Sequence, residues 1–139
     1  MEDNTKTIQL FDVKVIFADL EDRGYGRNIV IDATEPTIQE QISAWVKENN
    51  INGGEAKFKE YTTKDGEETK QYTFKLSNYT QFGGKDNLDE KALGYGAIIN
   101  LLASAYDYNN KFGKGTSAAL RAVYIREGAV KSALGEISK

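Results

Sequence analysis

The sequence predicts a mainly β fold, a small Greek-key barrel that carries one α-helix. The chain has 139 residues, one proline and 40% hydrophobic residues, which suits one folded domain with an ordinary core. β-Branched and aromatic residues recur in short alternating runs that are separated by turn residues, and only one long segment has helical spacing. We expect a single domain over residues 1–139, in which residues 127–139 form a terminal helix or a flexible tail.

Two strands are predicted at the start of the chain. Residues 7–20 are rich in β-branched and aromatic residues, as expected of one long strand. Alternation puts Val13, Val15 and Phe17 on the same side of it. A glycine turn over residues 21–27 follows, and residues 28–33 return as a second strand, which makes a hairpin the natural arrangement.

One helix is predicted over about residues 37–49. Pro36 precedes it, and Thr37 followed three residues later by Glu40 forms a capping-box pattern. The apolar face of this helix comprises Ile38, Ile42, Trp45 and Val46. An exposed tryptophan could stack on a ligand, but the place of Trp45 on this face favours burial.

A second hairpin is predicted from residues 56–62 and 70–76, around a turn that contains Asp65 and Gly66. Alternation gives it an apolar side, with Phe58 paired to Phe74 across the two strands. The other side is basic and comprises Lys57, Lys59, Tyr61, Gln71, Thr73 and Lys75. Taken alone, this side has an ordinary explanation, because exposed lysines keep a sheet soluble and block edge pairing.

The rest of the chain predicts a long connection and two more strands. Residues 77–96 form the connection, with a helical turn over 87–93, and Tyr79 and Phe82 in it either pack or stay exposed for stacking. Strands follow over 97–106 and 117–126. The loop between them adds two rings and two lysines to its glycines, at Tyr108, Lys111, Phe112 and Lys114. For this order of elements, the five-stranded OB-fold is the economical choice of barrel.

Composition argues against catalysis. The chain has neither cysteine nor histidine, which excludes disulfides, thiol nucleophiles and imidazole bases or metal ligands. Acidic residues around the first hairpin lack the spacing of a calcium loop, and the GYG and GKG segments match no phosphate-loop motif. We predict a protein that is not an enzyme and holds no cofactor or metal, with a magnesium-dependent nuclease as a remote alternative.

The charge is unevenly distributed. The net charge of −3 at first sight disfavours a nucleic acid, but residues 1–56 carry five basic and eleven acidic side chains, against thirteen and ten in residues 57–139. Because salt screens each charge beyond about 8–10 Å, an acidic protein can still carry a basic surface. No apolar run approaches the roughly 20 residues of a membrane helix, and the polar N-terminus does not fit a signal peptide. We therefore expect a cytoplasmic protein without a membrane partner.

The basic side of the second hairpin and the aromatic loop together indicate binding of single-stranded nucleic acid. Bases stack on exposed rings while phosphates attract lysine and arginine, and OB-folds hold single strands in this way. The candidate contact residues are Lys57, Lys59, Tyr61, Lys75, Tyr106, Tyr108, Lys111, Phe112, Lys114 and Arg121. The alternative is a small β-barrel protein–protein interaction module, such as a virion or regulatory component, that uses the same rings as hot spots.

The run from Tyr106 to Val123 also resembles the C-terminal strand, loop and strand of bacteriophage single-stranded DNA-binding proteins with an OB-fold, and residues 57–76 are compatible with their central hairpin. The resemblance implies sequence-independent binding of single-stranded DNA in phage DNA replication, recombination or repair, in the host cytoplasm and often as a small homo-oligomer. Many such proteins recruit replication or recombination proteins through an acidic tail. Residues 127–139 depart from this pattern with two acids against two lysines.

Overall fold

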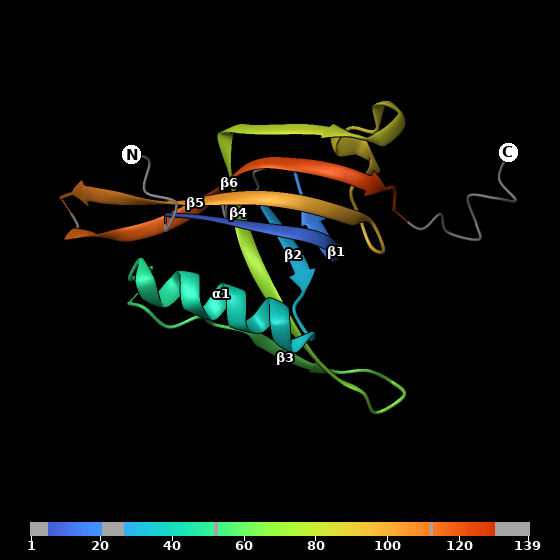
Figure 1. Ribbon diagram of the computed structural model, residues 1–139, viewed down its shortest axis with the longest axis horizontal. Helices are drawn as coiled ribbons and strands as arrows, with labels where there is room; N and C mark the ends of the chain where they lie inside the picture. The colour runs from blue at the N-terminus through green and yellow to red at the C-terminus, as the bar shows by residue number, and fades with distance from the viewer. Residues whose placement is uncertain (1–5, 21–26, 52, 112, 130–139) are drawn as a thin grey trace, which may run out of the picture.

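The structure is a computed structural model that describes residues 6–20, 27–51, 53–111 and 113–129 (Figure 1). Its elements are β1 (Thr7–Asp19), β2 (Asn28–Asp32), α1 (Pro36–Glu48), β3 (Lys59–Thr62), β4 (Glu68–Gly84), the 3-10 turns η2 (Lys85–Asn87) and η3 (Glu90–Ala92), β5 (Ile98–Asn110) and β6 (Gly113–Glu127). The strands follow the predicted order. Residues 130–139, expected to form a helix or a tail, lie outside the described residues, as does most of the turn predicted over residues 21–27.

Five strands close into a ring. β1 pairs with β2 and β5, β4 pairs with β2 and β6, and β5 pairs with β6. All these pairs are antiparallel except β4 with β6, which run parallel. β3 lies outside the ring and pairs with β4. This closed five-stranded barrel with one helix confirms the predicted OB-fold.

Helix α1 covers one end of the barrel (Figure 1). Trp45 is only 4% exposed, its ring centroid lies 6.2 Å from that of Phe74, and its Nε1–H donates to the Lys6 carbonyl at 3.0 Å. The predicted burial of Trp45 is confirmed. The core that α1 closes comprises, from the barrel strands, Leu10, Val13, Val15, Ile29, Ile31, Phe74, Ile99, Leu101, Leu120, Val123 and Ile125.

The predicted capping box is wrong. Pro36 is itself the first helical residue, because its fixed φ suits that position, and Glu35 becomes the N-cap with no side-chain cap bond. Thr37 is thereby moved into the first turn. Its hydroxyl donates to the Glu35 carboxylate at 3.1 Å instead of capping the helix.

The alternation predicted for β1 fails at its end. Val15 pairs with Ile31 and Phe17 with Val30, so one residue of β1 is extra between them and forms a β-bulge. Val13 and Val15 share a buried side of the strand, but the bulge turns Phe17 to the outside. The structure therefore separates Phe17 from the apolar side to which the sequence pattern assigned it.

The register of the second hairpin also differs from the prediction. Thr62 pairs with Glu68, and a five-residue turn lies between them, in which the Thr63 hydroxyl accepts from the Glu67 N–H at 3.1 Å. The ring of Phe58 consequently lies against Tyr72, with centroids 5.6 Å apart, and not opposite Phe74. The two sides of the hairpin are still those that alternation predicted, because the register error is an even number of residues.

β4 continues through most of the segment predicted as a connection. It turns a corner at residues 77–80, where its pairing with β6 jumps from Leu76–Leu120 to Gln81–Ala122. The Thr80 hydroxyl holds this corner by donating to the Leu120 carbonyl at 2.6 Å. Tyr79 projects from the corner and is exposed, whereas Phe82 packs against the core. The helical turn predicted over 87–93 is present only as the short turns η2 and η3.

Gly84 is expected to be intolerant of a side chain. An added Cβ would lie 2.7 Å from the Ile125 carbonyl oxygen and 2.8 Å from the Cβ of Leu88, so Gly84→Ala should lower the free energy of unfolding by about 1–3 kcal/mol. Gly83→Ala is the matched control, because an added Cβ there meets nothing within 4 Å. Urea unfolding followed by circular dichroism measures both variants, and equal stabilities would contradict the close packing at Gly84.

Candidate nucleic-acid interface

One outer face of the barrel runs across β1, β2, β4 and β3. Directly paired residues point to the same side of a sheet, so the register defines the members of this face. Its pairs are Phe17–Val30, Val30–Thr73, Asp19–Asn28, Asn28–Lys75, Asp32–Gln71, Gln71–Lys59 and Thr69–Tyr61. We call it the hairpin face and define it by Phe17, Lys59, Tyr61 and Lys75. It brings two rings and two ammonium groups onto one continuous surface.

Both rings of the hairpin face are accessible. Phe17 is 55% exposed and Tyr61 is 54% exposed, so each offers a π-face to a flat ligand. Tyr61 and the two lysines were candidates from the sequence. Phe17 was missed because a bulge cannot be recognised in an alternation pattern. The one sequence signal that Phe17 faces solvent was Asp19, a charged residue two positions further along the same strand and so on the same side.

A cluster of three aromatic rings supports the hairpin face from inside. The ring of Tyr72 lies between those of Phe58, at 5.6 Å, and Phe74, at 4.9 Å. Burial raises the pKa of the Tyr72 hydroxyl above its usual value, so it stays neutral at physiological pH. This packing holds β3 and β4 in a fixed position beneath the exposed side chains.

The hairpin face also carries the carboxylates of Asp19 and Asp32, and both have interaction partners. One oxygen of Asp32 accepts from the Thr34 N–H at 3.0 Å and from the Thr34 hydroxyl at 2.5 Å, which closes the turn before α1. Asp19 also has an interaction partner. The ammonium groups of Lys59 and Lys75 are exposed on the same surface. Their charge is available to a phosphate at low salt.

Lys57 lies beside the hairpin face, at a surface hollow of about 270 Å³. Ile51 and Glu55 line it from the segment that follows α1, and Tyr72 and Thr73 line it from β4. Ile51 also contacts β6, where it forms a β-bridge with Thr116. The hollow therefore lies between the hairpin face and the base of the β5–β6 hairpin.

The aromatic loop predicted between the last two strands is instead a β-ribbon. Pairing of β5 with β6 continues past Tyr106–Ser117 to Asn110–Gly113, beyond the last β1–β5 pair at Thr7–Ser104. We call residues 106–117 the arm; it projects from the barrel at the left of Figure 1. The prediction of a loop between residues 106 and 117 is wrong, because β5 extends to Asn110 and β6 begins at Gly113.

The arm divides the residues that the sequence grouped together. Tyr106 and Tyr108 occupy one side of β5. The ring of Tyr108 covers Gly115, because a Cβ added at that glycine would lie 2.7 Å from the Tyr108 hydroxyl oxygen. Lys114 pairs with Asn109 and points to the opposite side. Lys111 is exposed at the turn, and Phe112 lies outside the described residues.

Arg121 lies where the hairpin face meets β6. It is the extra residue of a bulge, because Leu102 pairs with Ala122 while Ala103 pairs with Leu120. Leu120 also pairs with Leu76, the neighbour of Lys75. Arg121 and Lys75 therefore flank one cross-strand pair, and both side chains are exposed.

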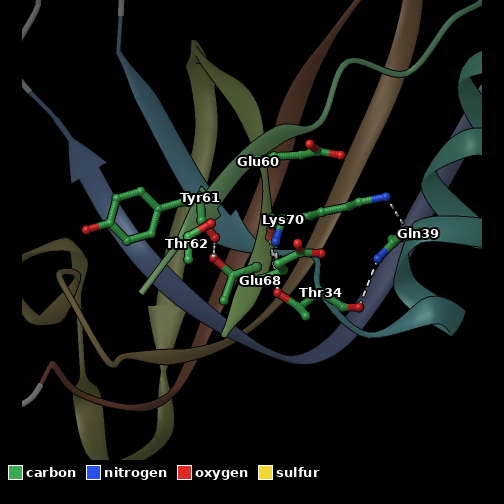
Figure 2. Close-up of a pocket in the computed structure, with 8 residues that line it drawn as sticks. Thr34, Gln39, Glu60, Tyr61, Thr62, Glu68 and Lys70 are labelled. Carbon is green, nitrogen blue, oxygen red and sulfur yellow. Dashed lines mark hydrogen bonds between the residues drawn. The ribbon is translucent and has the colours of Figure 1, made fainter. Parts of the chain in front are cut away.

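A polar hollow of about 200 Å³ lies at the β3–β4 hairpin, next to the start of α1, and its lining includes Tyr61 and Thr69 of the hairpin face (Figure 2). There the Gln39 amide donates to the Thr34 carbonyl at 2.8 Å, and the Lys70 N–H donates to the Thr34 hydroxyl at 3.0 Å. Figure 2 shows the Tyr61 ring pointing away from these groups. Glu60 and Glu68 outnumber the one lysine of this hollow, which makes it unsuitable for phosphate.

Neither a metal-binding cluster nor a membrane-spanning helix occurs among the described residues. The part of the chain that the structure describes contains no group of three or more acidic side chains able to hold a metal ion. Within those same residues no helix is long and apolar enough to span a membrane. What the described residues do present is an OB-fold barrel with exposed rings and basic side chains on its outer strands.

Comparison with known proteins gives matches in structure alone. The chain is similar to the single-stranded DNA-binding protein from bacteriophage Enc34, with a TM-score of 0.63 and 16% identity over 96% of this chain and 88% of that one. The same phage protein in complex with single-stranded DNA matches with a TM-score of 0.61 and 14% identity over 91% and 89%. No protein-family model and no curated protein matches the sequence. The resemblance to phage single-stranded DNA-binding proteins is thus confirmed in the fold, over most of the chain.

Proposed function

We propose that this protein binds single-stranded DNA without sequence preference, through the hairpin face and the arm, and acts without catalysis in phage DNA replication, recombination or repair. The observation that carries the proposal is the hairpin face itself, where Phe17 and Tyr61 are half exposed on the same surface as Lys59 and Lys75. Rings of this kind accept any base, and lysines follow the phosphates, so the recognition is independent of sequence.

The arm and the junction extend this surface. Tyr106 and Tyr108 offer further stacking surfaces, Lys57 and Arg121 lie at the edges of the hairpin face, and Lys111 and Lys114 add charge near the tip. The same fold occurs in a phage protein whose structure was determined in complex with single-stranded DNA. This similarity supports the choice of ligand, and the residues named here supply its chemistry.

Salt dependence tests the proposal. If Lys59, Lys75 and Arg121 each contact one phosphate, the logarithm of the association constant should fall with the logarithm of salt concentration with a slope of about −2. Titration of a fluorescent oligo-dT between low and physiological salt measures this slope. Replacing Lys59 by glutamine should reduce its magnitude by about 0.7.

Two outcomes would contradict the proposal. Absence of oligo-dT binding by the folded protein at low salt would exclude it. Binding with a slope near zero would favour the alternative of an aromatic protein–protein interaction module, because such an interface depends little on released counterions.

A further inference from the structure

A second pair of exposed rings lies away from the hairpin face, on the outer side of β1, β5 and β6. Phe11 is 64% exposed and Tyr124 is 47% exposed. Between them is an open hollow of about 180 Å³, which we call the ring hollow. Its outer lining comprises Gln9, Phe11, Asn100, Leu102, Ala122 and Tyr124. None of these residues belongs to the surface proposed above.

The ring hollow is held by a specific backbone feature. Leu10 pairs with Leu101 and Val13 with Ile99, so two residues of β1, Phe11 and Asp12, lie opposite Asn100 alone. Asp12 has a positive φ of 56°, and its N–H donates to the Asn100 side-chain oxygen at 2.9 Å. Phe11 follows the buried Leu10 and faces outward by ordinary alternation, in one row with Asn100 and its partner Tyr124.

The chemistry of the ring hollow fits a nucleobase. Two rings flank an apolar floor, and the side-chain amides of Gln9 and Asn100 lie beside it. Aromatic rings stack on base faces, and amide groups can donate to and accept from base edges. Asp12, the residue after Phe11, accepts from the Arg126 guanidinium at 2.7 Å.

The ring hollow is continuous with the proposed DNA surface. Lys75 and Arg121 flank the Leu76–Leu120 pair, and Ala122, the next residue after Arg121, lines the hollow. A strand that leaves the hairpin face past these two cations reaches the outer side of β6 directly. Leu102, which also lines the hollow, shares its side of β5 with Tyr106 and Tyr108 of the arm. Cations and rings thus lead to the ring hollow from both directions.

We propose that the ring hollow is a second base-binding site, which holds a nucleotide of a single strand that continues from the hairpin face past Lys75 and Arg121. This inference rests on the proposed function, because it requires single-stranded DNA on the hairpin face. With this second site the DNA-binding surface is longer than one side of the barrel. The ring hollow should therefore raise the affinity only for long strands.

Two lengths of oligo-dT test this inference with the variant Phe11→Ala/Tyr124→Ala. One has about 6 nucleotides, near the lower end of the site size of an OB-fold, and the other has about 30, beyond its upper end. We expect the variant to bind the short strand like the wild type and the long strand about tenfold or more weakly, the loss of one stacked base. Tyr95→Ala, which removes an exposed tyrosine outside the ring hollow, is the control and should change neither affinity.

Several results would overturn the inference. Unchanged affinity of the variant for the long strand would exclude a base in the ring hollow, and so would equal losses for both lengths. A variant that keeps both affinities but changes its oligomeric state in light scattering would assign the hollow to protein contacts instead. Failure of the wild type to bind either strand would refute the proposed function, which distinguishes that failure from an error about the ring hollow alone.

Discussion

Replacing Phe17 and Tyr61 together by alanine should weaken oligo-dT binding by about 2–6 kcal/mol, because each stacked base contributes about 1–3 kcal/mol. At about 1.4 kcal/mol per factor of ten, the loss of affinity is at least about thirtyfold. Both rings are about half exposed, at 55% and 54%, so their removal should leave the free energy of unfolding nearly unchanged. Fluorescence anisotropy with labelled oligo-dT and urea unfolding measure the two quantities on the same samples.

Tyr95→Ala is the matched control for this double variant. Tyr95 is also an exposed tyrosine, but its ring contacts Lys14, with Nζ 4.6 Å from the ring centroid, outside the hairpin face. Its replacement should leave DNA affinity intact. If the control and the double variant lost affinity equally, exposed rings would act through a general effect and the hairpin face would not be the contact surface.

The fold could be predicted because its main signals are periodic. Alternation identified the strands and the two sides of the β3–β4 hairpin, and the 3.6-residue period identified α1 and the burial of Trp45. The local interruptions could not be predicted. The bulges before Phe17 and at Arg121 each depend on the register with the neighbouring strand, which the alternation within one strand does not specify. The corner of β4 depends on Thr80 reaching the Leu120 carbonyl, forty residues away.

The same limits explain the errors in the candidate site. The sequence grouped Tyr108 and Lys114 because both lie near a glycine-rich turn, yet the register Asn109–Lys114 puts them on opposite sides of the arm. Local composition identified the chemistry of the segment, while the long strand pairing decided which side each residue faces. Phe17 and Phe11 escaped notice for a related reason, since a bulge in β1 separates each of them from Val13 and Val15, with which simple alternation groups them.

Replacing Trp45 by alanine should have the largest effect on stability, a loss of about 3–5 kcal/mol in the free energy of unfolding. The side chain is buried, packs on Phe74 and donates to the Lys6 carbonyl, so its loss would open a cavity between α1 and the barrel and remove this hydrogen bond. Trp45→Phe is the control; it keeps most of the packing and removes the hydrogen bond, and should cost less. Urea unfolding by circular dichroism checks both. Because Trp45 is buried beneath α1, the folded fraction of the alanine variant should keep the oligo-dT affinity of the wild type. Loss of oligo-dT affinity without loss of stability would instead mean that Trp45 stacks on bases.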